Sequence, residues 1–198
     1  MLAAVTFGLV LFLLLVQGVV AYVGLHSLNS KTSTLTDSTL PSVRSAGELQ
    51  AMISEYRNAF YQSLVRSSEQ VKEDAKKRKT ELKKSIDTTI STYEAVPQSA
   101  VNRKLFEAFV GDWKKASDSY KSVDEMLALD LPDDAIDTFT GETRYLHRKA
   151  VASLGKLIVE NNKLAKQTQD DAGTAYTTSA ALIVLMLLAG IAGGLLLA

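Results

Sequence analysis

Two arginines and a glutamine in one predicted helix are the residues best suited to bind an anion. Arg57 and Arg66 lie nine residues apart, with Gln62 between them. Because a helix turns by about 100° per residue, the two arginines lie on opposite sides of it, whereas Gln62 and Arg66 share a face. Guanidinium groups match the geometry of carboxylates. Two copies of this helix at a dimer interface could therefore hold one carboxylate between Arg57 of one chain and Arg66 of the other.

Two further polar residues are candidates for the same site. Thr138 and Tyr145 lie seven residues apart and share a helix face beside the predicted core residues Phe139 and Leu146. We predict that they are polar partners of the ligand. The alternative for Arg57 is a structural ion pair with an acidic neighbour.

Catalytic and metal-binding patterns are absent from the sequence. The two histidines, His26 and His147, are far apart and have no neighbours at metal-ligand spacing. A lone helical histidine is more often a surface or seam residue than a ligand. There is no cysteine, glycine-rich phosphate loop or nucleophile elbow. We therefore expect no enzyme activity, no catalytic residues, no metal site and no cofactor.

A basic run at 76–79 could suggest a patch for nucleic acid or lipid. Glu73 and Asp74 precede Lys77 and Arg78 by four residues, a spacing that stabilises an exposed helix face. The chain also balances 22 basic with 22 acidic residues, whereas nucleic-acid-binding domains are usually basic. We expect a solvated helix face and no nucleic-acid partner.

Hydrophobic residues between the two chain ends recur at steps of three and four, as in helical bundles. No segment alternates apolar and polar residues as a strand would. The sequence predicts an all-α fold, an antiparallel up-down four-helix bundle. The expected core residues, in chain order, are Leu49, Ile53, Tyr56, Phe60, Leu64; Val71, Ala75, Leu82, Ile86, Thr89, Tyr93, with Arg78 at one seam position; Leu105, Phe109, Ala116, Tyr120, Val123, Leu127; Ala135, Phe139, Leu146, Ala150, Leu157 and Leu164.

Helix boundaries can also be predicted from the sequence. Ser68 is expected to cap the second bundle helix, and Pro97 marks the turn before the third. Pro132, followed by two aspartates, is typical of a helix start. Pro41 lies within one very long first helix, where we expect a kink or short interruption.

Both ends of the chain are apolar and long enough to cross a bilayer. Residues 2–24 contain only Thr6 and Gln17 as interruptions, and residues 180–198 contain no polar side chain. We predict transmembrane helices at 1–25 and 175–198, in contact with membrane lipid, around a sensor domain at 26–174. A cleaved signal peptide is the alternative for the first segment, but no basic residue precedes Lys31. We expect a longer protein that continues beyond Ala198.

The sequence resembles the four-helix-bundle sensor domain of bacterial methyl-accepting chemotaxis receptors over its whole length. Four segments carry the likeness by their order and spacing: Gly24-Leu25-His26-Ser27-Leu28-Asn29-Ser30, Leu40-Pro41-Ser42-Val43, Glu55-Tyr56-Arg57-Asn58 and Glu160-Asn161-Asn162-Lys163-Leu164-Ala165. The resemblance implies a homodimer in the bacterial inner membrane with a periplasmic sensor domain. Amino-acid receptors of this family hold a carboxylate between paired first helices with three arginines. Arg57 and Arg66 fit the outer two of these three arginine positions, and Gln62 stands where the remaining arginine is expected.

The expected function is a sensory receptor that binds an organic acid or amino acid between the first and fourth bundle helices. The signal would pass inward through displacement of the fourth helix and the second span. One alternative is a membrane-anchored structural or adaptor bundle that binds a protein partner. Another is the sensor part of a histidine kinase or a diguanylate cyclase, because the same kind of domain precedes those enzymes.

Overall fold

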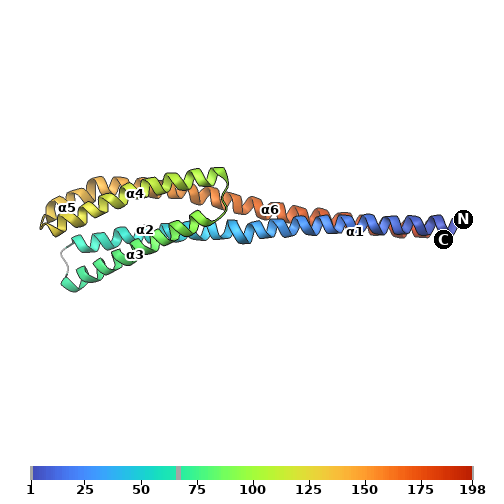
Figure 1. Cartoon of the computed structure of the whole chain (residues 1–198), viewed down its shortest axis with the longest axis horizontal. Coiled ribbons are helices and arrows are strands. Elements are labelled where there is room, and N and C mark those ends of the chain that lie inside the picture. Colours follow the sequence, from blue (N-terminus) through green and yellow to red (C-terminus); the bar gives the residue numbers. More distant parts are fainter. Residues whose placement is uncertain (1, 66–67, 198) are drawn as a thin grey trace. The chain divides into compact units, whose positions relative to one another are not determined.

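The computed structural model of the chain is built of helices (Figure 1). It describes residues 2–65 and 68–197, without the side chains of 2–6, 9–10, 13 and 194–197. No strand occurs in these ranges, which confirms the predicted all-α fold. The elements are α1 (Leu2–Thr34), the π-helical turn η1 (Leu35–Thr39), α2 (Leu40–Leu64), α3 (Glu69–Ala95), α4 (Ala100–Ala128), α5 (Pro132–Thr138), the π-helical turn η2 (Phe139–Thr143) and α6 (Arg144–Leu197).

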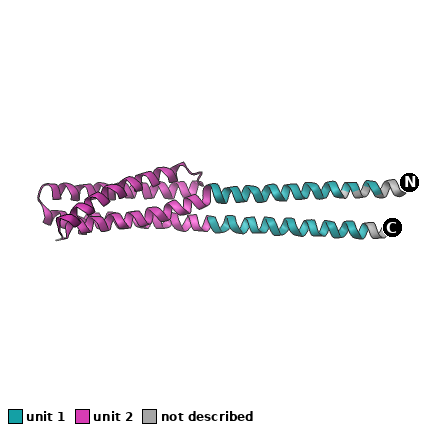
Figure 2. Cartoon of the chain, turned by 90° about the horizontal axis from the view of Figure 1, so that it is seen from below, with its two compact units in different colours: residues 1–37, 165–198 teal, residues 38–164 magenta. Residues whose placement is uncertain are grey.

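The chain divides into two compact units (Figure 2). The bundle unit, Ser38–Leu164, contains α2, α3 and α4, and its fourth helix consists of α5, η2 and the first part of α6. The terminal unit contains Met1–Asp37 and Ala165–Ala198. The bundle unit therefore has the predicted four helices.

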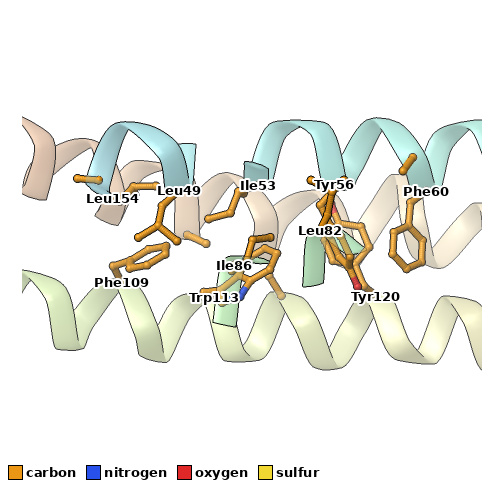
Figure 3. Packing of buried hydrophobic residues seen from close by; sticks show 14 of the residues in the cluster. Leu49, Ile53, Tyr56, Phe60, Leu82, Ile86, Phe109, Trp113, Tyr120 and Leu154 are labelled. Atoms are coloured by element: carbon orange, nitrogen blue, oxygen red, sulfur yellow. The ribbon is translucent and has the colours of Figure 1, made fainter. Parts of the chain in front are cut away.

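The hydrophobic core runs along the middle of the bundle unit (Figure 3). On α2 the predicted residues Leu49, Ile53, Tyr56 and Phe60 are all buried, as the steps of three and four require. Aromatic rings from α2 and α4 pack edge to face, with Tyr56 against both Trp113 and Tyr120. Most of the predicted core is thereby confirmed.

The seam of α3 differs from the prediction at two positions. Val71 is exposed, and Lys79, not Arg78, occupies the seam position between Ala75 and Leu82. The lysine is only 8% exposed because its ammonium group forms an ion pair with Asp124 of α4 and lies 4.1 Å from the centre of the Phe60 ring.

The fourth helix also has a different seam from the expected one. Its buried positions are Ala135, Phe139, Thr143, His147, Ala150, Leu154, Leu157 and Asn161. Two successive steps of four, from Phe139 through Thr143 to His147, would rotate away from the core in a regular α-helix. The wider turn of η2 lies at these steps and keeps the three residues on the inner face.

The predicted helix starts are confirmed. Ser68 accepts a hydrogen bond from the Val71 amide, and Ser99 accepts one from the Asn102 amide. Pro132 lies in the first turn of α5, followed by two acidic residues. The interruption expected near Pro41 is η1, immediately before α2, which has Pro41 in its first turn.

A buried amide group joins all four helices at the end of the bundle unit where α2 begins. Asn161 of α6 accepts from the Nδ2 atom of Asn102 on α4, and its own Nδ2 donates to the Ser42 carbonyl oxygen of α2 at 3.2 Å. The hydroxyl of Tyr93 on α3 lies 3.1 Å from both polar atoms of the same side chain. The amide thus fixes the four chain segments in one register.

The terminal unit brings α1 and the end of α6 together. A Cβ atom built at Gly24 would lie 2.8 Å from Cβ of Ser179, so only glycine permits this approach. About two turns further along the same two helices, Lys31 and Asp171 form an ion pair at 3.1 Å. The helical run Pro132–Gly193 includes a segment long and apolar enough to cross a membrane. Several side chains of the span predicted at 1–25 lie outside the described ones. This span and the predicted domain limits therefore stay predictions.

Candidate ligand-binding site

Arg57 lies on α2 next to the buried Tyr56, and its side chain is half-buried. The central carbon of its guanidinium group is 4.5 Å from the centre of the Phe139 ring, at the start of η2. This contact joins the first bundle helix to the fourth through a cation–π interaction. The arginine therefore contacts the fourth helix of its own bundle at this point.

The Arg57 guanidinium keeps an unused hydrogen-bonding capacity. Its Nη1 atom is buried and has no hydrogen-bond partner within the described part of the chain. No carboxylate among the described residues forms an ion pair with it, so the structural ion pair considered as an alternative is not observed there. Buried polar groups are normally paired, which makes this nitrogen a candidate contact for a ligand.

Two titratable side chains, Tyr120 and His147, lie near Arg57. We call Arg57, Tyr120, Phe139 and His147 the Arg57 cluster. Tyr120 of α4 and His147 of α6 are hydrogen-bonded, with Oη and Nδ1 3.1 Å apart. Burial raises the pKa of Tyr120 to about 12, and a hydrogen bond with Arg57, together with the Arg57 charge, partly opposes this effect. Burial, and secondly the charge of Arg57, lowers the pKa of His147 to about 4. At neutral pH both rings are uncharged, and the guanidinium is the charged member of the cluster.

The arrangement is suited to binding an anion. A guanidinium in a partly desolvated position attracts a carboxylate more strongly than it would in water. A carboxylate at Nη1 would touch α2 and lie close to the π-helical turn of the fourth helix. π-Helical turns within α-helices occur frequently at functional sites.

Comparison with protein families identifies this architecture. The family described as a four helix bundle sensory module for signal transduction matches residues 4–176, which is most of the chain. The chain belongs to this family. It is a sensory module of the chemoreceptor type, which confirms the resemblance stated from the sequence. Comparison with curated proteins finds no match.

The family membership and the apolar helix together indicate that the sensory module is associated with a membrane. The apolar part of α6 lies on the same helix as the last part of the bundle unit and follows it in sequence after the polar segment 165–179.

Gln62, Thr138 and Tyr145 are not part of the Arg57 cluster. Gln62 is exposed on α2, and Arg66 lies outside the described residues. Thr138 is half-buried, and its hydroxyl donates to the sulfur of Met126 on α4 at 3.5 Å. Tyr145 is 67% exposed. Their roles in binding stay predictions.

Tyr120 and His147 were not predicted as site residues, although Tyr120 was expected in the core. His147 was expected to be a surface or seam residue, and it occupies the seam. A signal for it was present in the sequence. The steps of three and four from His147 reach Ala150, Leu154 and Leu157, which fit a seam better than those from Leu146.

The other histidine and the basic run do not belong to the Arg57 cluster. His26 stacks on Tyr22 in the terminal unit. Among the described residues, no group of three or more histidine, aspartate or glutamate side chains could hold a metal ion. In the basic run, Arg78 bonds Glu55 of α2 and also pairs with Glu81 of its own helix at 3.6 Å.

Proposed function

We propose that the chain is a transmembrane sensory receptor whose bundle unit binds a small carboxylate, such as an organic acid or amino acid. The bundle unit would lie in the periplasm of a bacterium, and the chain would act as a homodimer. The observation that carries this proposal is the buried Nη1 atom of Arg57, which has no hydrogen-bond partner among the described residues. A carboxylate would supply that partner.

The position of Arg57 supports a mechanism for signalling. Its guanidinium lies over Phe139, so a ligand at this point would add contacts between α2 and the fourth bundle helix. Only a ligand that binds two conformations with different affinity can shift their populations. We infer that binding favours a conformation in which the fourth helix is displaced by a small amount. Since α6 continues as one helix from Arg144 to Leu197, the displacement would be passed toward the apolar segment.

A panel of carboxylates tests the binding step. The chain is placed in nanodiscs of neutral lipid, and its melting temperature is measured with acetate, succinate, malate, citrate, aspartate and glutamate. At least one compound should raise the melting temperature, because a ligand that binds only the folded state stabilises it. Loss of a charge-assisted hydrogen bond is worth about 1.5–3 kcal/mol, so Arg57→Ala should weaken binding about ten- to hundredfold.

Arg44→Ala is the matched control, because it removes an arginine from the same helix. The Arg44 side chain is 81% exposed and pairs with Glu48. This variant should bind like the parent. Equal affinity of the parent and Arg57→Ala for every compound that binds would disprove the role of Arg57.

The contribution of a second copy is tested with mixed dimers. In the proposed homodimer, Arg66 and Gln62 of one chain would reach the carboxylate held by Arg57 of the other. A dimer of one Arg57→Ala chain and one Arg66→Ala chain then has both losses in one site and an intact second site. Calorimetry should find half the binding capacity at near-native affinity. Loss of both native sites would instead show that each site is formed within one chain.

A further inference from the structure

A groove of about 1170 Å³ lies between α3 and α4. Tyr56 and Ser63 of α2 also line it, and Asp130 and Pro132 belong to its lining beyond the end of α4. The volume suits a small molecule. We call this feature the lysine groove, because five of its lining residues are lysines and three are aspartates.

The lysines follow the geometry of α3. Lys72, Lys76, Lys79 and Lys83 lie within about 60° of one another on the surface of α3, and Lys84 lies about 80° from Lys76. Lys76 and Lys84 are separated by about 12 Å along the helix axis, a distance that two long, flexible side chains can bridge from both ends.

The ion pairs in the groove involve only three of its five lysines. Asp87 is paired with Lys83 at 2.6 Å, and Asp124 is paired with Lys79. Lys72 pairs with Glu69, which is not part of the lining. No ion pair of Lys76 or Lys84 occurs among the described residues, and both side chains are exposed to the groove. Two ammonium groups are thus available for an anion.

Lys79 is a well-ordered residue in the lining of the groove. Its side chain is 8% exposed, and its ammonium group contacts Asp124 of α4, the hydroxyl of Ser63 and the Phe60 ring. A buried charge held by three partners orders this part of the groove, unlike a lysine on an open surface. Asp124 remains about half exposed, with a side-chain exposure of 45%.

We propose that the lysine groove binds a small polyvalent anion, with two or more negatively charged oxygens, between Lys76 and Lys84. The chemistry fits a phosphate compound or a polycarboxylate, because each ammonium group neutralises one charge of the ligand. A monovalent carboxylate would leave one of the two cations without a partner. Lys76 and Lys84 are not members of the Arg57 cluster, and the existence of this site does not depend on the function proposed above.

Calorimetry with defined anions tests this site. The chain in neutral-lipid nanodiscs is titrated with pyrophosphate and with citrate, and with acetate as the monovalent reference. The double variant Lys76→Ala/Lys84→Ala should bind the polyvalent anions at least about tenfold more weakly than the parent. The control Lys104→Ala/Lys114→Ala removes two exposed lysines of α4 outside the groove, with the same change in net charge. It should bind like the parent, as should Arg57→Ala.

Each contrary result overturns the proposal. Absence of binding by the parent, or equal binding by the two double variants, excludes a site formed by Lys76 and Lys84. Loss of anion binding in Arg57→Ala alone would assign the anion to the Arg57 cluster, which would support the proposed function and refute the lysine groove. Binding of acetate as tightly as of citrate would contradict the requirement for two charges.

Discussion

The Nδ2 atom of Asn102 donates a hydrogen bond to Oδ1 of Asn161 at 2.7 Å, inside the bundle and between α4 and α6. Asn161→Ala removes the acceptor for this amide together with the partners of Tyr93 and Ser42. Leaving buried polar groups unpaired is costly, so we expect the free energy of unfolding to fall by about 2–4 kcal/mol.

Chemical denaturation of the chain in detergent micelles, followed by circular dichroism, measures this loss. Asn162→Ala is the control, because the neighbouring asparagine is exposed on the same helix. The control should change stability by less than about 0.5 kcal/mol. Equal effects of the two substitutions would show that the buried amide does not stabilise the bundle.

Hydrophobic spacing was sufficient to predict the fold class and much of the core, including Leu49, Ile53 and Phe60. It could not predict the polar seam residues. Asn161 and Lys79 are buried because partners on other helices satisfy them, and a single helix contains no information on such partners. Periodicity alone therefore favoured Arg78 over Lys79.

The candidate site was predicted only in part. The sequence pointed to Arg57 as a cation in the first bundle helix, but its contact with Phe139 depends on how two helices pack. The turn η2 also shifts the seam, which brings His147 inward and leaves Leu146 half-buried.

Stability should depend on pH through His147. Its folded-state pKa of about 4 lies below its ordinary value of 6.5. The unfolded chain therefore binds more protons between pH 6.5 and pH 4, and stability falls as the pH falls through this range. His147→Gln keeps a hydrogen-bond acceptor for Tyr120 but does not titrate. The decrease in melting temperature from pH 7.5 to pH 5 should be smaller in this variant, and identical decreases would contradict the assignment.

Lys79 and Arg78 are neighbours, but their substitution should reduce stability by different amounts. Lys79→Ala removes a buried stem and the partner of Asp124, so we expect a loss of about 2 kcal/mol. Arg78→Ala breaks exposed pairs with Glu55 and Glu81 and should cost less than about 1 kcal/mol. Urea unfolding of both variants compares them directly. A larger loss for Arg78→Ala would refute the seam position of Lys79.

Gly24 should be required for the close approach of α1 and α6 in the terminal unit. A leucine there would overlap Ser179 and push the two helices apart. The pair Lys31→Cys and Asp171→Cys, which replaces an ion pair, reports on this distance through cross-linking by a short bismaleimide. Gly24→Leu should slow the cross-linking, whereas Gly18→Leu, with no neighbour within 4 Å, should not. Equal rates would show that the glycine is dispensable.

The most direct test of the proposed sensor is a distance measurement between α2 and α6 in the presence and absence of a carboxylate that binds. The chain contains no cysteine, so spin labels can be placed at Ser54→Cys and Lys156→Cys, both exposed in the bundle unit, without removing other thiols. Double electron–electron resonance in nanodiscs should show a ligand-dependent change of about 1–2 Å in the mean distance. The change should disappear when Arg57→Ala is added. A saturating ligand that leaves the distance unchanged, or a shift that persists without Arg57, would contradict the account.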